Sequence, residues 1–589
     1  MCGIIGFIGG REAAPIVLEG LRKLEYRGYD SAGLAIVSDG RLLVRKDVGG
    51  PNEVAKRHNL GELPGRVAIG HTRWATHGRV TCLNAHPHID CKGEIAVVHN
   101  GIIENYQELR EKLNGHRFLS ETDTEVIPHL LERYMENGAS LEEALREVIK
   151  ELRNSYAILA ISKTDGQKIV GACRDKPLII GLGEEGNFIA SDTLAFTSKT
   201  NRIIFIEEGE MAVLTAEKVL LLDAEGRHVE KKVEQIEVET EDALKPDYPC
   251  YMLKEILEQP KVIRQASMQN RDLIMEAALD ISRAKEVILT ACGTSRYAAI
   301  IGRYLFSKLA KRFSDVVMAS EFHYFVDSID DNTLVIAISQ SGETEDVLRG
   351  VKRARENDAA ILSIVNRKGS LLTRMSDQVI YLNCGPELAV PATKSFTGQL
   401  VIFYLLSFAM MNRLEECMTK LGEISYLEEE NLRLDGKKIE GLAERLKGNR
   451  DFYYIGRGIN FAIAAEGALK LKEISYIHAE GMPAGELKHG TLALIEKGTP
   501  VVAICPSDNT FDETLCNVAE AKSRGAIIIG ISDCDHRDFD EWIPIPRVDE
   551  IFYPLVSVVP LQLLAYHLAV ARGLDPDRPR NLAKSVTVR

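Results

Sequence analysis

The chain has 589 residues, of which 45% are hydrophobic and 27% are charged, a composition typical of globular protein. A single hydrophobic core stops growing at about 250–300 residues, so we expect several domains. The formal net charge of −14 argues against a surface that binds nucleic acid or an anionic membrane, and we predict neither partner. An anionic substrate would have to be held by local groups, such as helix N-termini or a few lysines.

The eleven cysteines lie far apart, and no CxxC pair occurs among them. This spacing indicates neither a zinc site nor a thioredoxin-like pair, so we predict no metal. An odd number of widely spaced cysteines suits a reducing compartment.

The N-terminus has no basic segment and only a short apolar run, so we do not expect a signal peptide. Residues 551–571 contain no Asp, Glu, Lys or Arg and resemble a membrane span in composition. Pro554 and Pro560 interrupt this stretch, which favours a buried strand-and-helix segment. We therefore predict a cytoplasmic protein.

Up to about residue 240 the chain mixes short apolar runs with helical patterns. The runs are typical of strands and lie at 34–37, 67–69, 95–98, 156–161, 178–180 and 188–190. The helical patterns lie at 12–25, 104–113, 124–136 and 141–152. This mixture predicts sheets covered by helices rather than a regular βαβ alternation. A polar, charge-dense stretch at 228–247 then predicts a linker.

Beyond a helical segment at 251–283 the pattern changes to βαβα and then recurs. Apolar strands beginning at 287, 335 and 361 have counterparts at 452, 501 and 527, roughly 165 residues later. This predicts a duplicated α/β domain with parallel sheets, joined by a Glu-rich helical connector at 413–447.

Cys2 is the first residue with an evident chemical use. Removal of Met1 would place a free α-amine beside the thiol, so that one residue supplies both base and nucleophile. The alternative is a small buried residue, the usual fate of a free cysteine.

The segment Ser339-Gln-Ser-Gly-Glu-Thr344 follows a buried strand and opens a helix. Backbone N–H groups and the helix dipole would point outward there, and the Ser and Thr hydroxyls add donors for a phosphate. The alternative is a plain N-cap turn.

Three further groups of residues are ambiguous by themselves. Glu466, Lys470 and Glu473 fall on one helical face, which is either solvent-exposed or turned into a cleft where Glu473 moves a proton. His489 stands in a glycine-bounded loop, and a lone loop histidine usually faces solvent. Lys584, near the C-terminus, is either a surface lysine or an amine for a sugar carbonyl.

These residues and several longer motifs resemble the glutamine–fructose-6-phosphate aminotransferase (isomerising) family, over essentially the whole chain. The motifs of the first part are Cys2-Gly-Ile, Tyr26-Arg-Gly-Tyr-Asp-Ser-Ala-Gly33, His71-Thr-Arg-Trp-Ala-Thr-His-Gly78, Asn84-Ala-His-Pro-His88, His99-Asn-Gly-Ile-Ile-Glu-Asn105 and Ser120-Glu-Thr-Asp-Thr-Glu125. The resemblance implies an α/β multidomain fold: an N-terminal αββα glutaminase of the N-terminal-nucleophile (Ntn) hydrolase type, then two sugar-isomerase (SIS) domains. The implied ranges are 1–227 for the glutaminase, 228–276 for a linker, 277–412 and 448–580 for the SIS domains, 413–447 for the connector and 581–589 for a tail entering the sugar site.

In the first domain the resemblance implies that Cys2 attacks the glutamine amide. Asn100 and Gly101 would form the oxyanion hole, whose donors face charge that develops only in the transition state. Arg73 and Asp123 would hold the two charged ends of glutamine, which suits a zwitterion. The same pocket would be completed by Thr76 and His77, with Trp74 as the gate for ammonia.

In the remainder the resemblance implies a sugar-phosphate site made by Thr294, Ser339, Gln340, Ser341 and Thr344, with Glu387 and the turn Ala392-Thr-Lys394 nearby. Glu473 would be the base that shifts a proton from C1 to C2. His489, from a neighbouring subunit of a homodimer, would assist ring opening. Lys470 would lie near the reacting oxygens and Lys584 would form the imine.

The resemblance implies an enzyme that hydrolyses L-glutamine and uses the ammonia to convert D-fructose 6-phosphate into D-glucosamine 6-phosphate without a cofactor. The sequence departs from the family around Cys250, where the usual histidine is missing, and it lacks the long insertion of feedback-inhibited animal enzymes. The alternatives are a sugar-phosphate sensor or an amino-sugar-phosphate deaminase with an idle glutaminase. A purine-pathway or asparagine-forming amidotransferase would need a diphosphate or ATP loop that the sequence does not show.

Overall fold

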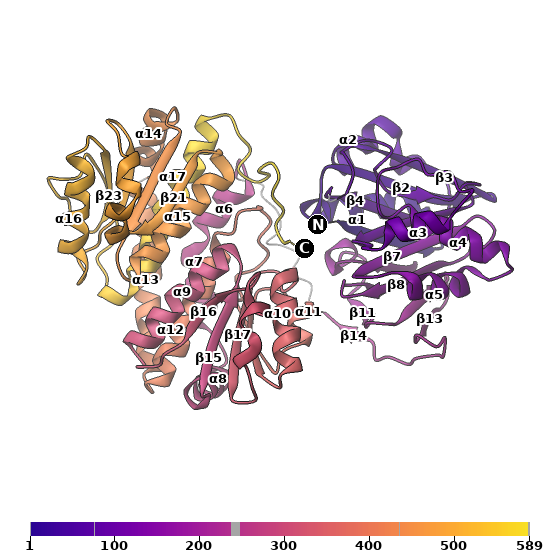
Figure 1. Cartoon of the computed structure of the whole chain (residues 1–589), viewed down its shortest axis with the longest axis horizontal. Coiled ribbons are helices and arrows are strands. Elements are labelled where there is room, and N and C mark those ends of the chain that lie inside the picture. The colour runs from indigo at the N-terminus through magenta and orange to yellow at the C-terminus, as the bar shows by residue number, and fades with distance from the viewer. Residues whose placement is uncertain (1, 76, 237–247, 435, 587–589) are drawn as a thin grey trace. The chain divides into compact units, whose positions relative to one another are not determined.

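The computed structural model describes residues 2–75, 77–236, 248–434 and 436–586. The chain divides into two compact units, Met1–Thr240 with Ser585–Arg589 and Glu241–Lys584 (Figure 1). Each unit has its own sheets and its own hydrophobic core, and each is described by itself below.

The first unit contains two antiparallel sheets within its described residues. The larger has the order β14 (Glu234–Gln235), β11 (Arg202–Phe205), β9 (Ile179–Leu182), β10 (Gly186–Ala190), β1 (Gly3–Gly9), β4 (Val67–Arg73), β2 (Ser31–Ser38) and β3 (Arg41–Val48). The smaller has the order β13 (Val219–Leu222), β12 (Met211–Leu214), β8 (Ile169–Arg174), β7 (Tyr156–Ser162), β6 (Ile95–Gly101) and β5 (His88–Ile89).

The side chains of β1 show how these sheets are layered. Ile4 and Ile8 share a core cluster with residues of β6 and β7, whereas Ile5 and Phe7 share another with residues of α1 (Ala13–Lys23). Because successive strand residues point to opposite faces, one face of the larger sheet packs on the smaller sheet and the other on α1. The far face of the smaller sheet packs on α4 (Val126–Glu136) and α5 (Leu141–Glu151). The result is the predicted αββα order, and this part of the fold prediction is confirmed.

The helices described in the first unit fall close to the predicted ranges, except the one at 51–58, where no helix was predicted. They are α1 (Ala13–Lys23), α2 (Pro51–His58), α3 (Tyr106–Lys112), α4 (Val126–Glu136) and α5 (Leu141–Glu151). The start of α5 shows how the sequence sets a boundary: Ser140 and Glu143 form a reciprocal capping box, in which each side chain bonds the other residue's backbone N–H.

The second unit contains two five-stranded parallel sheets in its described part. The first has the order β16 (Asp315–Met318), β15 (Glu286–Ala291), β17 (Thr333–Ser339), β18 (Ala360–Val365) and β19 (Gln378–Tyr381). The second has the order β21 (His478–Pro483), β20 (Asp451–Gly456), β22 (Pro500–Ile504), β23 (Ile527–Ser532) and β24 (Glu541–Pro544). Both follow the order 2-1-3-4-5 along the chain, so the predicted parallel, duplicated SIS architecture is confirmed.

The helices of this unit are α6 (Tyr251–Leu257), α7 (Gln259–Ser267), α8 (Arg271–Arg283), α9 (Gly293–Lys308), α10 (Glu345–Glu356), α11 (Leu371–Arg374), α12 (Lys394–Met410), α13 (Leu414–Leu434), α14 (Gly436–Leu446), α15 (Asn460–Ser475), α16 (Phe511–Lys522) and α17 (Tyr553–Ala571). One core cluster includes residues of both sheets and of α9, α12, α15 and α17. The two SIS domains therefore share a hydrophobic core within this unit.

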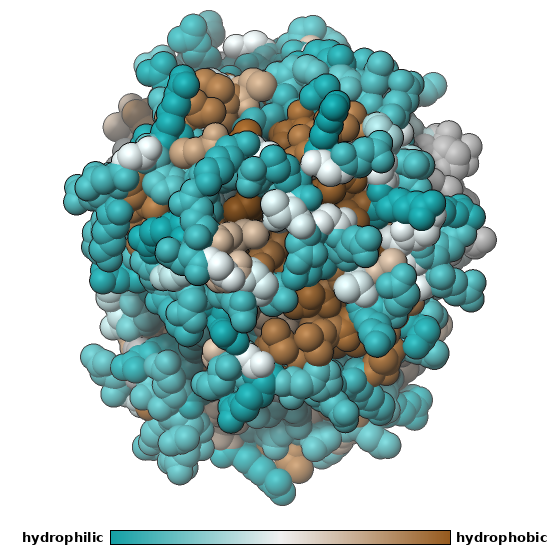
Figure 2. Space-filling view, turned by 90° about the vertical axis from the view of Figure 1, so that its right-hand side faces the viewer, coloured by the Kyte–Doolittle hydropathy of each residue, from teal (hydrophilic) through white to brown (hydrophobic). Residues whose placement is uncertain are grey.

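One helical segment among the described residues, Glu550–Ala571, is long and apolar enough to cross a membrane. In the folded chain 83% of its most apolar window is buried, as expected for the core helix of a globular domain. The face drawn in Figure 2 is mainly hydrophilic with separate hydrophobic areas, a distribution that is normal for a protein surface.

Candidate functional site

Cys2 immediately precedes β1, in the centre of the larger sheet of the first unit. Its Sγ accepts a hydrogen bond from the backbone N–H of Trp74 at 3.3 Å and lies 3.5 Å from the carbonyl oxygen of the same residue. Burial raises the pKa of the Cys2 thiol, and the Trp74 N–H and the charge of Arg73 oppose this rise. The thiol is thus held in place, but it needs a base to become a nucleophile at neutral pH.

Asn100 and Gly101 end β6, and the structure brings them beside Cys2. The Asn100 Nδ2 donates to the carbonyl oxygen of Cys2 at 2.8 Å. The Asn100 Oδ1 is buried without a hydrogen-bond partner, so this side chain is not fully satisfied. Gly101 has φ +135°, and a Cβ there would lie 2.2 Å from the Ser155 carbonyl oxygen, so the position requires glycine.

Arg73 ends β4 and is 3% exposed. Its guanidinium has five N–H donors, and it uses some of them to donate to the carbonyl oxygens of His77 and Arg79. Burial lowers the pKa of Arg73, while electrostatic interactions with the ionisable thiol of Cys2 and with Asp30 and Asp123 oppose this effect. The predicted thiol and the predicted glutamine-binding arginine and aspartate therefore lie within electrostatic range of one another.

The remaining residues of this predicted pocket are placed as follows. Asp123 is buried and accepts from the Ile103 N–H at 2.7 Å. The His77 Nδ1 is buried without a partner, and the Trp74 ring packs edge-on against Tyr29 at 5.7 Å. Thr76 lies outside the described residues.

Two features of this pocket were not singled out from the sequence. Asp30 accepts from the Ala75 N–H at 2.8 Å, which ties the segment after β4 to the β2 side of the sheet. Four buried histidines form a second feature: His71, His86, His88 and His99. Asp30 and the four histidines all lie within the motifs quoted above, and those motifs are the sequence feature that could have indicated them.

Burial keeps the four histidines neutral. It lowers the pKa of His71 to about 3 and that of His99 to about 4, and it lowers those of His86 and His88 well below the ordinary value. The His71 and His86 rings stack at 4.0 Å, and His99 Nδ1 lies 2.9 Å from Thr124 Oγ1. These neutral rings connect β4 and β6 to the segment that carries Asp123.

In the second unit, the segment 339–344 lies at the carboxyl end of β17, as its sequence suggested. Ser339 Oγ lies 3.0 Å from Thr344 Oγ1 and accepts from the Gly342 N–H at 3.0 Å. Gly342 has φ +66°, and a Cβ would meet Ser370 Oγ at 2.0 Å. Ser341 Oγ accepts from the Glu343 N–H at 3.1 Å, and the half-buried Gln340 lies between the two serines. The segment is a tight, hydroxyl-rich turn at the N-terminus of α10.

The position of this turn in the sheet supports a role in ligand binding. β15 and β17 are adjacent although β16 lies between them in the chain, so the strand order reverses between them. Ligands of open parallel sheets bind at this reversal, beyond the carboxyl ends of the strands. Thr294, in the first turn of α9 after β15, lies on the same edge.

The second SIS domain has the same reversal between β20 and β22, but a carboxylate occupies the equivalent turn. Asp508 accepts from the N–H and Oγ1 of Thr510, at 2.8 and 2.7 Å, and from Asn460 Nδ2 at 2.8 Å. Thr510 immediately precedes α16, as Thr344 immediately precedes α10. A phosphate at this second turn would be repelled by Asp508.

The structure brings Glu466, Lys470 and Glu473 together on α15, against the start of α9. Lys470 Nζ lies 2.6 Å from Glu473 Oε2 and 3.5 Å from Glu466 Oε1, and it donates to Thr294 Oγ1 at 3.0 Å. Thr294 in turn donates to Glu466 Oε1 at 3.2 Å. This face is buried rather than solvated, apart from the half-buried Glu473.

The charges in this cluster are strongly perturbed. Burial raises the pKa of Glu466 to about 8, with Lys470 opposing and Glu473 adding to the rise. Burial alone would lower the pKa of Lys470, but the carboxylates of Glu466, Glu473 and Glu387 raise it. Lys470 is therefore a cation at neutral pH, and Glu473 is the half-buried carboxylate beside it.

The side chain of Lys584 is 3% exposed and reaches Glu387. Its Nζ donates to Glu387 Oε2 at 2.5 Å, and Glu387 Oε1 accepts from the N–H groups of Thr393 and Ser395 at the start of α12. Burial alone would raise the pKa of Glu387, but Lys584 and these N–H groups hold it well below its ordinary value. Lys394, in the predicted turn, pairs instead with Glu258 at 2.7 Å.

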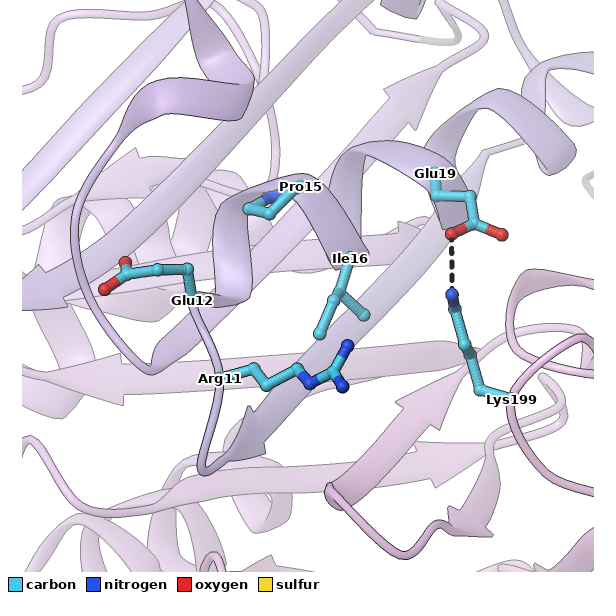
Figure 3. A pocket seen from close by; sticks show the side chains of 6 residues that line it. All are labelled: Arg11, Glu12, Pro15, Ile16, Glu19 and Lys199. Carbon is cyan, nitrogen blue, oxygen red and sulfur yellow. Dashed lines mark ion pairs between the residues drawn. The ribbon is translucent and has the colours of Figure 1, made fainter.

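His489 ends a short 3₁₀ helix, Ala484–His489, and is exposed. The structure therefore does not bury it with Lys470 and Glu473 of the same chain. Figure 3 shows a separate surface hollow lined by Arg11, Glu12, Pro15, Ile16, Glu19 and Lys199, with Lys199 and Glu19 paired at 3.1 Å. None of these six is a predicted site residue.

Comparison with known proteins agrees with both halves of this description. A family model for the glutamine amidotransferase domain matches residues 71–198, and a model for the SIS domain matches residues 280–409 and 446–572. Residues 280–572 of the second unit thus contain two copies of one domain.

The chain is also similar to whole proteins of known family. It is 49% identical to glutamine--fructose-6-phosphate aminotransferase [isomerizing] of Thermococcus kodakarensis and 48% identical to that of Methanothermobacter thermautotrophicus, over 100% of both chains in each case. Among solved structures it is similar to the C-terminal domain of glucosamine-fructose-6-phosphate aminotransferase from Francisella tularensis, with a TM-score of 0.54 and 34% identity. That match covers 57% of this chain and 100% of the other. The chain therefore belongs to the glutamine–fructose-6-phosphate aminotransferase (isomerizing) family.

Proposed function

We propose that this protein hydrolyses L-glutamine and transfers the ammonia to D-fructose 6-phosphate, giving D-glucosamine 6-phosphate and L-glutamate. Among the structural observations, the placement of Cys2 supports this proposal most strongly. The Trp74 N–H donates to the Cys2 thiol at 3.3 Å, and the Asn100 side-chain amide donates to the carbonyl oxygen of Cys2 at 2.8 Å. Similarity over the full length to relatives of that name supports the choice of both substrates.

For the glutaminase step, Cys2 is the nucleophile and its α-amine, freed by loss of Met1, is the base. The buried thiol has a raised pKa, so a neighbouring base is needed to remove its proton. The Asn100 side chain and the Gly101 N–H are the oxyanion donors. Arg73 binds the α-carboxylate of glutamine and Asp123 its α-amine, Thr76 and His77 line the pocket, and Trp74 gates the ammonia.

For sugar binding, the phosphate lies on the turn at 339–344 of the first SIS domain. Its Ser and Thr hydroxyls and the N-terminus of α10 supply donors for a dianion, at the sheet edge where ligands bind. The second SIS domain carries Asp508 at the equivalent turn, which supports one phosphate site per chain rather than two.

For the sugar chemistry, Glu473 moves the proton between C1 and C2 while Lys470 stabilises the charge on the reacting oxygens. The Lys470 ammonium lies 2.6 Å from the Glu473 carboxylate, so the proposed base and the proposed charge-stabilising group lie side by side. Lys584 forms the imine with the open-chain sugar. Glu387 anchors the segment that carries this lysine, so its contribution to the sugar site is made through Lys584.

The assembly and its location are also proposals. The protein is a cytoplasmic homodimer in which His489 of one subunit completes the sugar site of the other, because within one chain this histidine is exposed. The ranges 1–227, 228–276, 277–412, 413–447, 448–580 and 581–589 remain our division of the chain into glutaminase, linker, first SIS domain, connector, second SIS domain and tail.

The test is to incubate the purified protein with glutamine and fructose 6-phosphate and to identify both products by mass spectrometry. The proposal expects glutamate and glucosamine 6-phosphate in equal amounts. Glutamate without the amino sugar, or no reaction of glutamine at all, would contradict it.

A further inference from the structure

A cluster of four metal-ligating side chains lies in the first unit, outside the predicted glutamine pocket. It consists of Cys91, His116, His129 and Glu132, whose ligand atoms all lie within 4.8 Å of one another. None of these residues was used in the account of glutamine hydrolysis above. The proposed glutaminase chemistry therefore does not account for this cluster.

Three separate segments deliver these side chains. Cys91 follows β5, His116 follows α3, and His129 and Glu132 stand three residues apart on α4, so both point from one face of that helix. Exposed fractions are 16% for the His116 side chain, 1% for His129 and 6% for Glu132, while Cys91 is exposed. The cluster is thus mostly buried, with the thiol on its outer side.

The distances between the ligand atoms match a tetrahedral metal centre. Cys91 Sγ lies 3.6 Å from the Nδ1 of each histidine, and the two Nδ1 atoms lie 3.3 Å apart. Glu132 Oε2 lies 3.1 Å from His116 Nδ1 and 3.7 Å from His129 Nδ1. Zinc bond lengths in a regular tetrahedron require about 3.6 Å between sulfur and nitrogen and about 3.3 Å between two nitrogens.

Hydrogen bonding alone explains this cluster less well. Two imidazole Nδ1 atoms that face each other can share only one proton, and both also face the same sulfur and the same carboxylate oxygen. A cation at the centre would satisfy all four lone pairs at once. The Arg117 N–H donates to Cys91 Sγ at 3.3 Å, a contact that stabilises a thiolate.

We propose that Cys91, His116, His129 and Glu132 bind a structural Zn²⁺ ion. One sulfur, two nitrogens and one oxygen in tetrahedral positions suit Zn²⁺ better than Mg²⁺ or Ca²⁺, which prefer oxygen ligands. The Cys91 thiol loses its proton to solvent on binding, so thiolate and carboxylate together neutralise the ion. Four protein ligands fill the tetrahedron and leave no position for a reacting water, which makes the site structural rather than catalytic.

The surroundings connect this site to the glutaminase pocket. The second nitrogen of His129, Nε2, is buried without a hydrogen-bond partner, and Glu125 Oε1 lies 3.9 Å from it, beyond hydrogen-bond range. Glu125 accepts from the N–H groups of Leu119 and Ser120, both at 2.7 Å. Asp123 lies in this same segment, so the ion would fix the N-terminal end of α4 and the loop that precedes it.

The test measures bound metal on the full chain without a histidine tag, purified in the absence of chelators. Elemental analysis should find about one zinc ion per chain after free metal is removed. Cys91→Ser should lose the zinc, whereas Cys82→Ser, which alters another exposed cysteine of the same unit, should retain it. Chelation of the wild type should lower its unfolding temperature, and added Zn²⁺ should restore it.

Reconstitution with Co²⁺ gives a second readout that does not depend on activity. The Co²⁺ form should show the intense visible bands of a tetrahedral centre and a thiolate charge-transfer band that Cys91→Ser removes. The His116→Ala variant, altered at a partly exposed ligand, should also lose the metal if folded. No bound zinc in wild type incubated with Zn²⁺, or equal zinc in Cys91→Ser and Cys82→Ser, would overturn the proposal.

Discussion

Lys584 Nζ lies 2.5 Å from the carboxylate of Glu387, and both side chains are almost fully buried. Almost 200 residues separate the two in the chain, and their contact holds the last segment of the second unit against the start of α12. Removing one partner of a buried ion pair leaves an uncompensated charge, which commonly costs about 3–5 kcal/mol. This contact therefore anchors the lysine proposed to react with the sugar.

The first prediction separates the anchoring of Lys584 from its chemistry. Lys584→Arg keeps a cation for Glu387 but cannot form an imine, so amino-sugar formation should fall to background while the unfolding temperature stays near that of wild type. Glu387→Gln keeps the amine but loses the ion pair, and it should lower both stability and activity. Enzyme assay and differential scanning calorimetry measure the two effects.

Borohydride reduction in the presence of fructose 6-phosphate identifies the reacting lysine directly. The sugar adduct should appear on the peptide that contains Lys584. An adduct on Lys394 or Lys470 would reassign the imine to that residue and reject the role proposed for Lys584.

The second prediction concerns the two SIS domains, which offer a matched pair of threonines. Thr344→Ala should weaken fructose 6-phosphate binding about 10–100-fold, because a hydrogen bond to a charged group contributes about 1.5–3 kcal/mol. Thr510→Ala alters the equivalent helix start beside Asp508 and should leave the KM for the sugar unchanged. Steady-state kinetics of both variants are decisive: an equal effect of the two would contradict a phosphate site in the first domain alone.

The third prediction tests Glu473 as the proton-transferring base. Glu473→Gln should lower amino-sugar formation by about 10²–10⁴-fold, the usual effect of removing a general base. Glutamine hydrolysis should be spared, because Cys2 acts independently. Glu496→Gln, at an exposed position of the same domain, is the control and should behave like wild type. Unimpaired product formation in Glu473→Gln would reject the role.

The fourth prediction concerns Cys2. The isolated protein should begin at this residue, which intact-mass analysis would show as the absence of Met1. Cys2→Ala should abolish glutamine hydrolysis yet leave isomerisation of the sugar phosphate detectable, because no residue of the sugar site is changed. Cys82→Ser should affect neither reaction. Equal loss of both activities in Cys2→Ala would show that the two sites are not separable.

The fifth prediction is a pH dependence of the first unit. His71 has a folded-state pKa of about 3 and His99 of about 4, both below the value of about 6.5 expected in the unfolded chain. The unfolded state therefore binds protons first as the pH falls below about 6.5, and stability is lost. Each such histidine lowers the free energy of unfolding by about 1.4 kcal/mol for every unit that the pH falls between about 6.5 and the folded-state pKa of that histidine.

The two tryptophans of the chain make this measurable, since Trp74 belongs to the first unit and Trp542 to the second. In a Trp542→Phe variant, Trp74 fluorescence should report an unfolding temperature that falls between pH 6.5 and pH 5, before most carboxylates titrate. An unfolding temperature that does not change over this range would show that the histidines are not buried in the neutral form.

Local sequence patterns predicted the elements of this fold well. The run of Ser and Thr at 339–344 was correctly placed at the carboxyl end of a strand because an apolar strand pattern precedes it. Glu466, Lys470 and Glu473 were placed on one face because helical spacing alone determines that. Whether the face is solvated or buried depends on α9, and that packing is not encoded in the spacing.

Contacts between distant segments could not be predicted from patterns. Nothing local to Lys584 indicates Glu387, and nothing local to Asp508 indicates that it fills the counterpart of the phosphate turn. The cluster around Cys91 could not be predicted for the same reason, because its ligands come from three separate segments and not from closely spaced cysteines. The sequence by itself indicates only that His129 and Glu132, three residues apart, share one helical face.

The most direct measurement of the central claim uses glutamine labelled with ¹⁵N in its side-chain amide, together with fructose 6-phosphate and an excess of unlabelled ammonium. If the chain passes ammonia from the Cys2 site to the sugar site, the glucosamine 6-phosphate formed should carry ¹⁵N. Labelled ammonium in solution with glutamate, and no labelled amino sugar, would contradict the account.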